Sequence, residues 1–525
     1  MTHAIPHRLG ATPLGGGRCR FEVWSPRTAN VAVHLVDDDR VVAMAPIDDD
    51  HHYAVEVDAV PDGARYRYRL GDRGEWPDPA SRAQPDGVHG PSAAVDLAFT
   101  WTDQRWQGAS LDALVLYELH VGTFTAEGTF DAVIPHLARL RALGVTAIEL
   151  MPVAQCPGAR NWGYDGVYPY AVQPAYGGPL GLKRLVDAAH REGLGVHLDV
   201  VYNHLGPEGN YLGQYGPYFT DVYKTPWGSA LNFDGPHSDA VRRYFIENAL
   251  QWVEDFHLDG LRLDAVHAIV DRSSYPFLEE LSDRVHARAE ALGREVLVVA
   301  ESDANDPRLV QRKALGGMGL DGVWSDDFHH AVHALLTGER DGYYMDFGRA
   351  SDLAEAWRHG AAYRGRRSSF RQRRHGRDAP EVEGPRHVVC SQNHDQVGNR
   401  ARGERLIALT DLARAKLAAA LVILSPNTPL LFMGEEHGET APFLYFIDHG
   451  DAGLIEAIRR GRTEEFKDFA WTGELPDPAA VETMRRCVVD HDAREREPGR
   501  ALYALYGELL KARARLRPRE GERDG

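Results

Sequence analysis

Three acidic residues stand at the ends of three expected strands in the sequence. Asp264 lies in "GLRLDAVH" (260–267), Glu301 in "VVAES" (298–302) and Asp395 in "SQNHD" (391–395). Carboxylates brought together at the ends of such stretches bind divalent cations, or they serve as nucleophile, acid and base at a glycosidic bond. The residue types alone leave both chemistries open.

Arg262 and Asp264 stand two residues apart in one apolar segment. Side chains two apart in a strand face the same way, so these two charges share one space. An unpaired buried charge is costly, and the pair is therefore either a structural ion pair or a functional one. In the glycosidase interpretation, Arg262 keeps Asp264 ionised as a nucleophile.

The other acidic residues fit complementary roles in glycosidic chemistry. Glu301 follows the run "VLVVA", and partial desolvation there would raise its pKa toward that of a general acid. Asp395, beside His394, could hold sugar hydroxyls and respond to developing positive charge. Tyr164 offers an aromatic face to a sugar ring.

Further polar residues stand at or just after the expected strand ends. They are Glu118, His120, Asp165, Asp199, Asn203, His204, His267, Asp303, Asp326 and Asn393. Two tryptophans, Trp227 and Trp324, belong to the same regions and are candidates either for substrate contact or for core packing.

The competing chemistries have less support in the residue pattern. The first strand offers a single histidine, His120, and the spacing of His197 and His204 fits no zinc chelate. None of the six lysines ends an expected strand, which argues against Schiff-base chemistry. No phosphate-binding glycine loop is present either. We therefore expect no cofactor and no bound metal, although a divalent-metal hydrolase stays an alternative.

Eight short apolar segments alternate with amphipathic helical segments from about residue 111 onward, which predicts parallel βαβ units. Closing eight such units gives a (β/α)₈ TIM barrel, in which the carboxyl ends of the strands form the active-site face. The expected strands are 113–122, 146–153, 195–204, 260–267, 295–303, 322–328, 387–395 and 428–436.

The regions flanking the barrel follow other patterns. Alternation with period two predicts a small β-sandwich within residues 1–100. The barrel is expected to span 101–470 with an insert at about 339–386, which carries the cationic run "YRGRRSSFRQRRHGR". Residues 471–525 are expected to form two helices, over 478–494 and 501–517, followed by a charged tail.

Composition limits the classes of partner and compartment. The 525-residue chain is 43% hydrophobic with a formal net charge of −18, which argues against nucleic-acid binding. Its four cysteines, Cys19, Cys156, Cys390 and Cys487, form no CxxC pair and suggest a reducing compartment. No secretory signal or membrane-spanning run is visible. We expect a cytoplasmic protein.

Four motifs, "DVVYNH" (199–204), "GLRLDAVH", "VVAES" and "SQNHD", resemble in order and spacing the signature regions of the α-amylase family of retaining glycoside hydrolases. The resemblance implies that Asp264 is the nucleophile, Glu301 the acid/base and Asp395 the transition-state stabiliser. It also implies a substrate-binding set made of Tyr164, Asp199, Asn203, His204, Arg262, His267 and His394.

Longer stretches between about residues 114 and 440 are most similar to those family members that hydrolyse the α-1,4 bond next to a terminal trehalose unit. The resemblance implies maltooligosyltrehalose as the substrate, release of trehalose, and a pathway link to maltooligosyltrehalose synthase. Similar enzymes usually end in a small β domain, whereas a short helical C-terminal segment is expected here.

Two further interpretations are compatible with the same motifs. A glycogen-branching or debranching enzyme would share the barrel, the sandwich and the carboxylates, and the sequence does not show whether water or a sugar hydroxyl accepts the glycosyl group. A catalytically silent glucan-binding protein could also be built on this barrel, although the complete set of carboxylates disfavours it.

Overall fold

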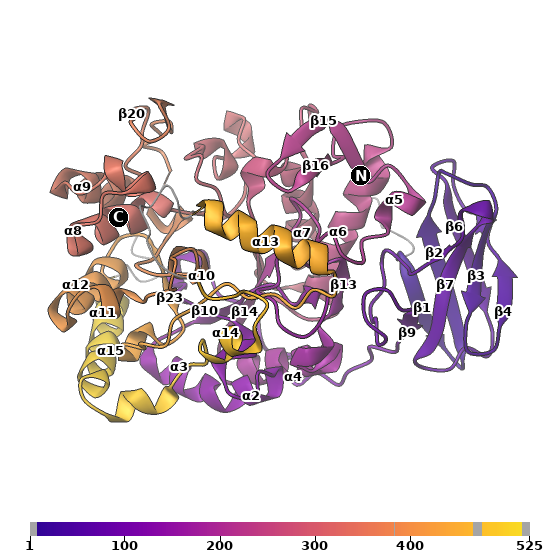
Figure 1. Ribbon diagram of the computed structural model, residues 1–525, viewed down its shortest axis with the longest axis horizontal. Helices are drawn as coiled ribbons and strands as arrows, with labels where there is room; N and C mark the ends of the chain where they lie inside the picture. The colour runs from indigo at the N-terminus through magenta and orange to yellow at the C-terminus, as the bar shows by residue number, and fades with distance from the viewer. Residues whose placement is uncertain (1–7, 383, 466–474, 517–525) are drawn as a thin grey trace.

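The computed structural model describes residues 8–382, 384–465 and 475–516 of the chain. At its centre is a closed barrel of parallel strands, each three to six residues long (Figure 1). In barrel order the strands are β10 (Leu116–Leu119), β11 (Ala147–Leu150), β14 (Gly195–Val200), β17 (Gly260–Leu263), β18 (Leu297–Ala300), β19 (Gly322–Trp324), β22 (His387–Val389) and β23 (Thr428–Phe432). All eight expected segments contain a barrel strand, so the predicted (β/α)₈ architecture is confirmed.

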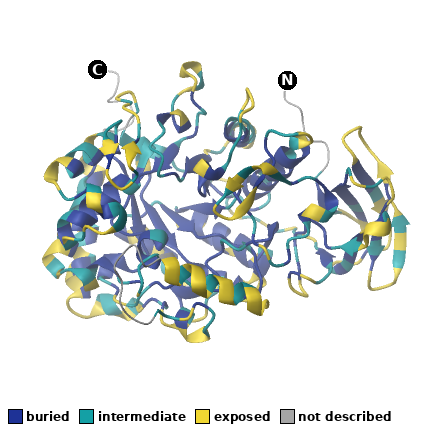
Figure 2. Ribbon diagram, turned by 45° about the horizontal axis from the view of Figure 1, so that its top comes forward, coloured by how far each residue is buried: buried dark blue, intermediate teal, exposed yellow. Residues whose placement is uncertain are grey.

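Helices cover the outside of the barrel, and their apolar faces bury its strands (Figure 2). In α3, the side chains of Leu137, Leu140 and Leu143 are buried, and Gly144 ends the helix in the left-handed conformation at φ 116°. The principal covering helices are α3 (Leu137–Leu143), α4 (Gly178–Arg191), α6 (Ser238–Glu254), α7 (Phe277–Leu292), α8 (Asp326–Thr337) and α12 (Leu412–Ile423).

The loops at the carboxyl ends of the strands carry short elements of their own. These are α1 (Val121–Phe124), α2 (Phe130–Val133), β12 (Ala154–Gln155), β13 (Tyr168–Val172), α5 (Leu212–Tyr215), β15 (Phe219–Thr225), β16 (Gly228–Leu231), α10 (His394–Gly398), α11 (Leu406–Leu409) and α13 (Ala452–Glu465). The region predicted as a cationic insert contains α9 (Ala350–His359), β20 (Arg367–Ser368) and β21 (Arg373–Arg374).

The N-terminal region forms the predicted β-sandwich from two antiparallel sheets. One sheet has the order β1-β2-β6-β5, and the other has β4-β3-β7-β8 with β9 also paired to β7. Their bounds are β1 (Gly10–Gly15), β2 (Arg18–Trp24), β3 (Val31–Leu35), β4 (Arg40–Ala43), β5 (Ala45–Pro46), β6 (His52–Val57), β7 (Ala64–Leu70), β8 (Glu75–Trp76) and β9 (Ser92–Ala94). The chain that leaves β8 therefore returns to the sandwich at β9.

The sandwich packs against helix α6 of the barrel. Arg243 on α6 donates to Glu22 of β2 at 2.8 Å, and the rings of Trp24 and Tyr218 meet edge to face at 5.0 Å. Both contacts are largely removed from water, so they fix the sandwich at one end of the molecule, where Figure 1 shows it.

The last part of the described chain is helical, as expected, but in shorter pieces. The continuous helix predicted over 478–494 is wrong, because only α14 (Val481–Arg485) and a short 3₁₀ turn, His491–Glu495, are helical. Between them the Val489 amide donates to the Thr123 carbonyl at 3.1 Å, a long-range bond that a continuous helix would not allow. Helix α15 (Gly499–Leu516) then packs on α3 and α12. The predicted charged tail beyond residue 516 lies outside the described residues.

Two findings concern membranes and cysteines. In the described part of the chain, no helix is long and apolar enough to cross a membrane. All four cysteines carry free thiols and are buried. Burial raises the pKa of the Cys156 thiol, so the thiol is neutral and packs as a small hydrophobic group.

Helix α15 depends on one buried cation for its attachment. Arg513 is 4% exposed and donates to main-chain oxygens at and just after the end of α12, those of Ile423, Ser425 and Asn427. Arg513→Met, which keeps the aliphatic stem, should lower the free energy of unfolding by about 2–4 kcal/mol, because it leaves buried carbonyls without a donor. Denaturant unfolding measures the loss. The exposed neighbour Arg515→Met is the matched control and should be neutral; equal stability of both variants would contradict the assignment.

Candidate functional site

The carboxyl ends of the barrel strands gather most of the predicted site residues. Asp199 and Arg262 are direct partners in the parallel pair β14 and β17, so both side chains face the barrel interior. Asp264 follows β17 and Glu301 follows β18, while Asp395 lies on α10 just beyond β22. The strand order therefore brings together residues that are far apart in the sequence.

Arg262 is the centre of this site. Its guanidinium is 2% exposed, and Nη1 donates to Asp199 Oδ2 at 2.5 Å and to Asp264 Oδ1 at 2.9 Å. Its other terminal nitrogen, Nη2, lies 3.7 Å from Glu301 Oε2. The ring of Trp324 lies beneath the guanidinium, with its centre 4.3 Å from Cζ. One buried cation thus lies close to three carboxyl groups.

Asp264 is held from both sides. One carboxylate oxygen accepts from Arg262, and the other accepts from the Asn203 amide at 2.8 Å. The same amide also donates to the Asp264 main-chain oxygen at 2.8 Å. The carboxylate therefore has a fixed orientation before any substrate binds.

A strained turn follows Asp264 and links it to Glu301. Ala265 has the left-handed backbone conformation, with φ 41° and ψ 50°, which costs a residue other than glycine about 1 kcal/mol or more. In this conformation its amide donates to Glu301 Oε2 at 2.7 Å. The strain is thus associated with a contact that positions the second carboxyl group.

Burial raises the pKa of Glu301 well above its usual range. The charges of Asp264, Asp326 and Asp395 raise it further, whereas Arg262 opposes the shift. Burial and the charge of Asp395 also raise the pKa of Asp326 to about 7. Glu301 can therefore carry a proton at neutral pH, which a general acid requires.

A second network runs from Tyr164 to a carboxylate on the first strand. The Tyr164 hydroxyl donates to Asp199 Oδ2 at 2.6 Å and is bonded to His394 Nε2 at 2.7 Å. Glu118 accepts from the His394 main-chain amide at 2.9 Å and bonds to the ring nitrogen Nδ1. Burial lowers the pKa of His394, but the Glu118 charge outweighs it and the pKa is raised. His394 is therefore a donor toward Tyr164.

The remaining predicted residues differ in exposure. His204 is buried, bonds to the Tyr164 carbonyl at 3.0 Å and stacks on Trp227, which is 49% exposed, at 4.5 Å. Asp395 is partly exposed and accepts from Asn399 Nδ2 at 2.6 Å. His267 is exposed in the short turn Val266–Ala268, away from the Arg262 network.

The two tryptophan candidates have different surroundings in the structure. Trp324 is a core residue beneath Arg262, whereas Trp227 is available to solvent at the mouth of the barrel.

Two acidic residues have roles that sequence reasoning missed. Glu118 was visible at a strand end, but nothing in its own segment showed that it pairs with His394. Glu149 on β11 is buried with both carboxylate oxygens unpartnered, and burial raises its pKa well above its usual range. Its only sequence signal is an acid inside an apolar strand.

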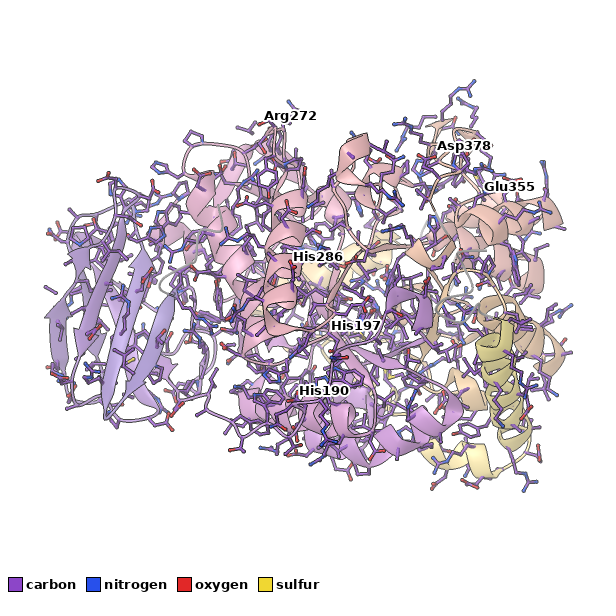
Figure 3. The ribbon with its side chains drawn as sticks, turned by 180° about the vertical axis from the view of Figure 1, so that it is seen from behind. His190, His197, Arg272, His286, Glu355 and Asp378 are labelled. Atoms are coloured by element: carbon purple, nitrogen blue, oxygen red, sulfur yellow. The ribbon has the colours of Figure 1, made fainter. Side chains whose placement is uncertain are left out.

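Below the site, the barrel interior also contains a polar side chain. His197 on β14, labelled in Figure 3, is buried there. A Cβ at Gly260 would come within 2.5 Å of its ring. Burial lowers the pKa of His197 to about 4, so it is neutral. Among the described residues, no group of three or more histidine, cysteine, aspartate or glutamate side chains is arranged to hold a metal ion.

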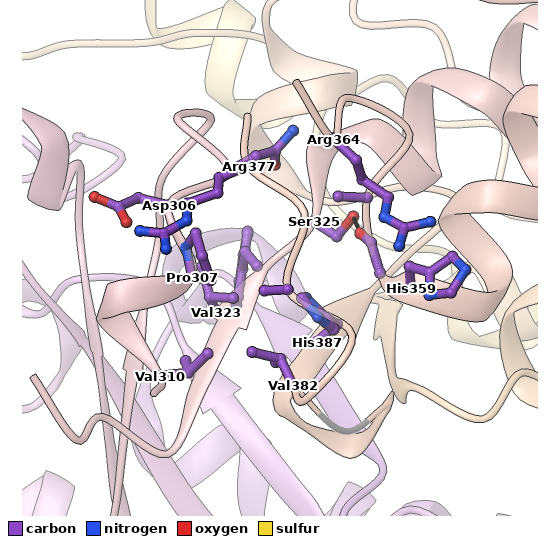
Figure 4. Close-up of a pocket in the computed structure, with 15 residues that line it drawn as sticks. Asp306, Pro307, Val310, Val323, Ser325, His359, Arg364, Arg377, Val382 and His387 are labelled. Carbon is purple, nitrogen blue, oxygen red and sulfur yellow. Dashed lines mark hydrogen bonds between the residues drawn. The ribbon is translucent and has the colours of Figure 1, made fainter. Parts of the chain in front are cut away.

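A small cavity lies beside the site rather than in it (Figure 4). Val323 and His387 contribute from two barrel strands, and Arg364 and Arg377 contribute from the insert. Asp264, Glu301 and Asp395 do not line it. Trp324 is the side chain that this cavity shares with the surroundings of Arg262.

Comparison with known proteins gives two family matches. Residues 77–224 match the α-amylase catalytic domain, and residues 8–81 match carbohydrate-binding module 48, the isoamylase N-terminal domain. A crystal structure described as a putative α-amylase from Salmonella typhimurium superposes with a TM-score of 0.90 at 42% identity, covering 97% of this chain and 86% of that one.

Curated relatives are more specific. Malto-oligosyltrehalose trehalohydrolase from Saccharolobus solfataricus is 51% identical over 87% of this chain and 79% of its own length. The enzyme of the same name from Arthrobacter ramosus is 47% identical over 95% of this chain and 87% of its length. A 1,4-α-glucan branching enzyme from Synechococcus is 30% identical over 62% of this chain and half of its own length.

The Arg262 network predicts how stability responds to its removal. Arg262→Ala should lower the free energy of unfolding by about 3–5 kcal/mol, because Asp199 and Asp264 lose the cation that compensates their burial. Thermal and denaturant unfolding measure the effect. Adding Asp199→Asn in the same chain should recover part of the loss, since it removes one of the unpaired charges. Stability equal to that of the wild type in Arg262→Ala would contradict the compensation.

Proposed function

The chain belongs to the malto-oligosyltrehalose trehalohydrolases of the α-amylase family, and on this basis we propose that it hydrolyses the α-1,4-glucosidic bond next to the terminal trehalose unit of maltooligosyltrehalose. The products are trehalose and a maltooligosaccharide shortened by that unit. The observation that carries the chemistry is that Asp264 and Glu301 lie on the two arms of one buried guanidinium. Such a pair supplies one ionised and one protonated carboxyl group.

Asp264 is proposed as the nucleophile. Its carboxylate attacks the anomeric carbon and forms a covalent glycosyl-enzyme as the bond to the trehalose oxygen breaks. Hydrogen bonds from Arg262 and Asn203 orient its carboxylate for this step. Water then attacks the same carbon from the opposite side, releases Asp264 and leaves the anomeric configuration retained.

Glu301 is proposed as the acid and then the base. In the first step it donates its proton to the departing glycosidic oxygen, and in the second it takes a proton from the attacking water. The raised pKa supports the first role, because it keeps the proton on Glu301 at neutral pH. Once the proton has gone, Arg262 at 3.7 Å stabilises the carboxylate.

The other predicted residues are proposed to bind the sugar ring at the cleaved bond. Asp395 faces the positive charge that develops on the ring, and Tyr164 supplies an aromatic surface. The remaining polar side chains hold hydroxyl groups or support those that do: Asp199, Asn203, His204, Arg262, His267 and His394.

The branching or debranching alternative is not favoured. Relatives named trehalohydrolase match at 42–51% identity over most of the chain, whereas the branching enzyme matches at 30% over a smaller part. We further propose a pathway link to maltooligosyltrehalose synthase, which produces this substrate, and a cytoplasmic location. The proposed domains are the sandwich at 1–100, the catalytic barrel at 101–470 with its insert, and the C-terminal segment at 471–525.

Product analysis tests the proposed reaction. The purified chain should release free trehalose from maltooligosyltrehalose and leave a plain maltooligosaccharide of equal length almost unchanged. Asp264→Asn should abolish the release while the chain stays folded, because the amide cannot form the glycosyl intermediate. Chromatography of the products and circular dichroism measure both.

Other products would identify other activities. Branched or shortened glucan without trehalose would transfer the proposal to the branching or debranching class. Full activity in Asp264→Asn would remove Asp264 from the chemistry, and loss of activity only after chelation would point to a metal-dependent reaction.

The pH profile tests the role of Glu301. The charge of Asp326 helps to raise the pKa of Glu301, so Asp326→Asn should lower that pKa. Glu301 would then lose its proton at lower pH, and the alkaline limb of kcat/KM should move to lower pH. The exposed Glu192→Gln, at the opposite end of the barrel, removes the same charge and should leave the limb in place. A limb that stays or moves upward in Asp326→Asn would contradict this role.

A further inference from the structure

Helix α13 contacts α10, the helix that carries Asp395, through one arginine. Arg462 Nη1 donates to Asn399 Oδ1 at 3.2 Å, and its Nη2 donates to the Gly398 carbonyl at 3.1 Å. Asn399 in turn donates through Nδ2 to Asp395 Oδ1 at 2.6 Å. Two successive hydrogen bonds thus connect Arg462 to Asp395, which is distant in the sequence.

The two hydrogen bonds from Arg462 to Asn399 and from Asn399 to Asp395, which we name the relay, have a defined direction because of the chemistry of the three side chains. A guanidinium only donates and an ionised carboxylate only accepts, whereas an amide does both at different atoms. Arg462 therefore holds the oxygen of the Asn399 amide toward itself, which leaves the amide nitrogen facing Asp395. If the amide turned over, its oxygen would face the Asp395 carboxylate and repel it.

Arg462 is itself held in place. Its guanidinium lies 5.0 Å from the ring centre of Tyr445, a cation–π distance, and Tyr445 meets Trp162 edge to face at 5.2 Å. Trp162 also supports α10 directly, because a Cβ at Gly398 would come within 2.0 Å of its ring. The end of α10 is therefore fixed between an indole ring and a guanidinium.

The same segment of chain also contacts the opposite wall of the site. Just before α13, His449 bonds to Glu208 at 2.9 Å and lies 3.6 Å from Asp165, the residue after Tyr164. Residues 445–462, which we name the strap, thus contact the Tyr164 side through His449 and the Asp395 side through Arg462. Figure 1 shows α13 crossing in front of the barrel.

We propose that Arg462 is a positioning residue for Asp395, acting through the Asn399 amide, and that the strap sets the distance of Asp395 from the Tyr164 wall. The inference rests on the role proposed above for Asp395. Because Asp395 would interact most strongly with the charge that develops in the transition state, loss of its orientation should reduce kcat more than it changes KM.

A double-mutant cycle on trehalose release tests the relay. Arg462→Ala and Asn399→Ala should each lower kcat about tenfold or more, since small displacements of a catalytic group are costly, and leave KM nearly unchanged. The double variant should be slowed by less than the two single losses multiplied together, because Arg462 acts on Asp395 largely through Asn399. Arg459→Ala is the matched control: it lies on the same helix but pairs with Asp477 at 2.7 Å, and it should keep wild-type kcat.

The outcomes separate the inference from the function on which it rests. If Asp395→Asn, measured in the same series, keeps wild-type kcat, the proposed function of Asp395 fails. If Asp395→Asn is inactive but Arg462→Ala is fully active, or if the losses of the two single variants multiply, the relay alone is overturned. Arg462→Lys, which keeps the charge but loses the two-pronged geometry, replaces Arg462→Ala if that variant does not fold, and a wild-type kcat in it would also overturn the relay.

Discussion

The site depends on one buried guanidinium. A charge with only 2% of its surface exposed is tolerated because Arg262 has carboxylates around it and an indole ring beneath it. Its charge affects each neighbour differently: Asp264 receives a direct hydrogen bond, whereas Glu301 lies farther away and keeps a raised pKa. A single cation thereby gives two adjacent acids different electrostatic surroundings.

The barrel and its acidic strand ends could be predicted because their signals are local. Each strand is a short apolar run, and a charge directly after such a run must lie at the strand end. Asp264 and Glu301 could be identified from the sequence for this reason. The break between α14 and the following 3₁₀ turn was not, because it depends on a hydrogen bond between Val489 and Thr123, which are distant in the sequence.

The support of the site was the part that sequence reasoning missed. Glu118 and His394 are separated by 276 positions, and their pairing arises only when the barrel closes between β23 and β10, which places β10 and β22 on either side of β23. The contact of Arg462 with α10 likewise depends on the course of the loop before α13. The residue type identifies a reactive group, whereas the partners that orient this group come from the elements that the topology places beside it.

The left-handed conformation of Ala265 strains the native state but makes the geometry of the active site more definite. Glycine adopts this conformation without strain, so a glycine at position 265 would relax the backbone of the native state. It would also let the amide that holds Glu301 sample more directions, and the spacing of the two reacting carboxyl groups would become less definite. The methyl group of Ala265 therefore restricts the turn, and part of the folding free energy is exchanged for a narrower range of active-site geometries.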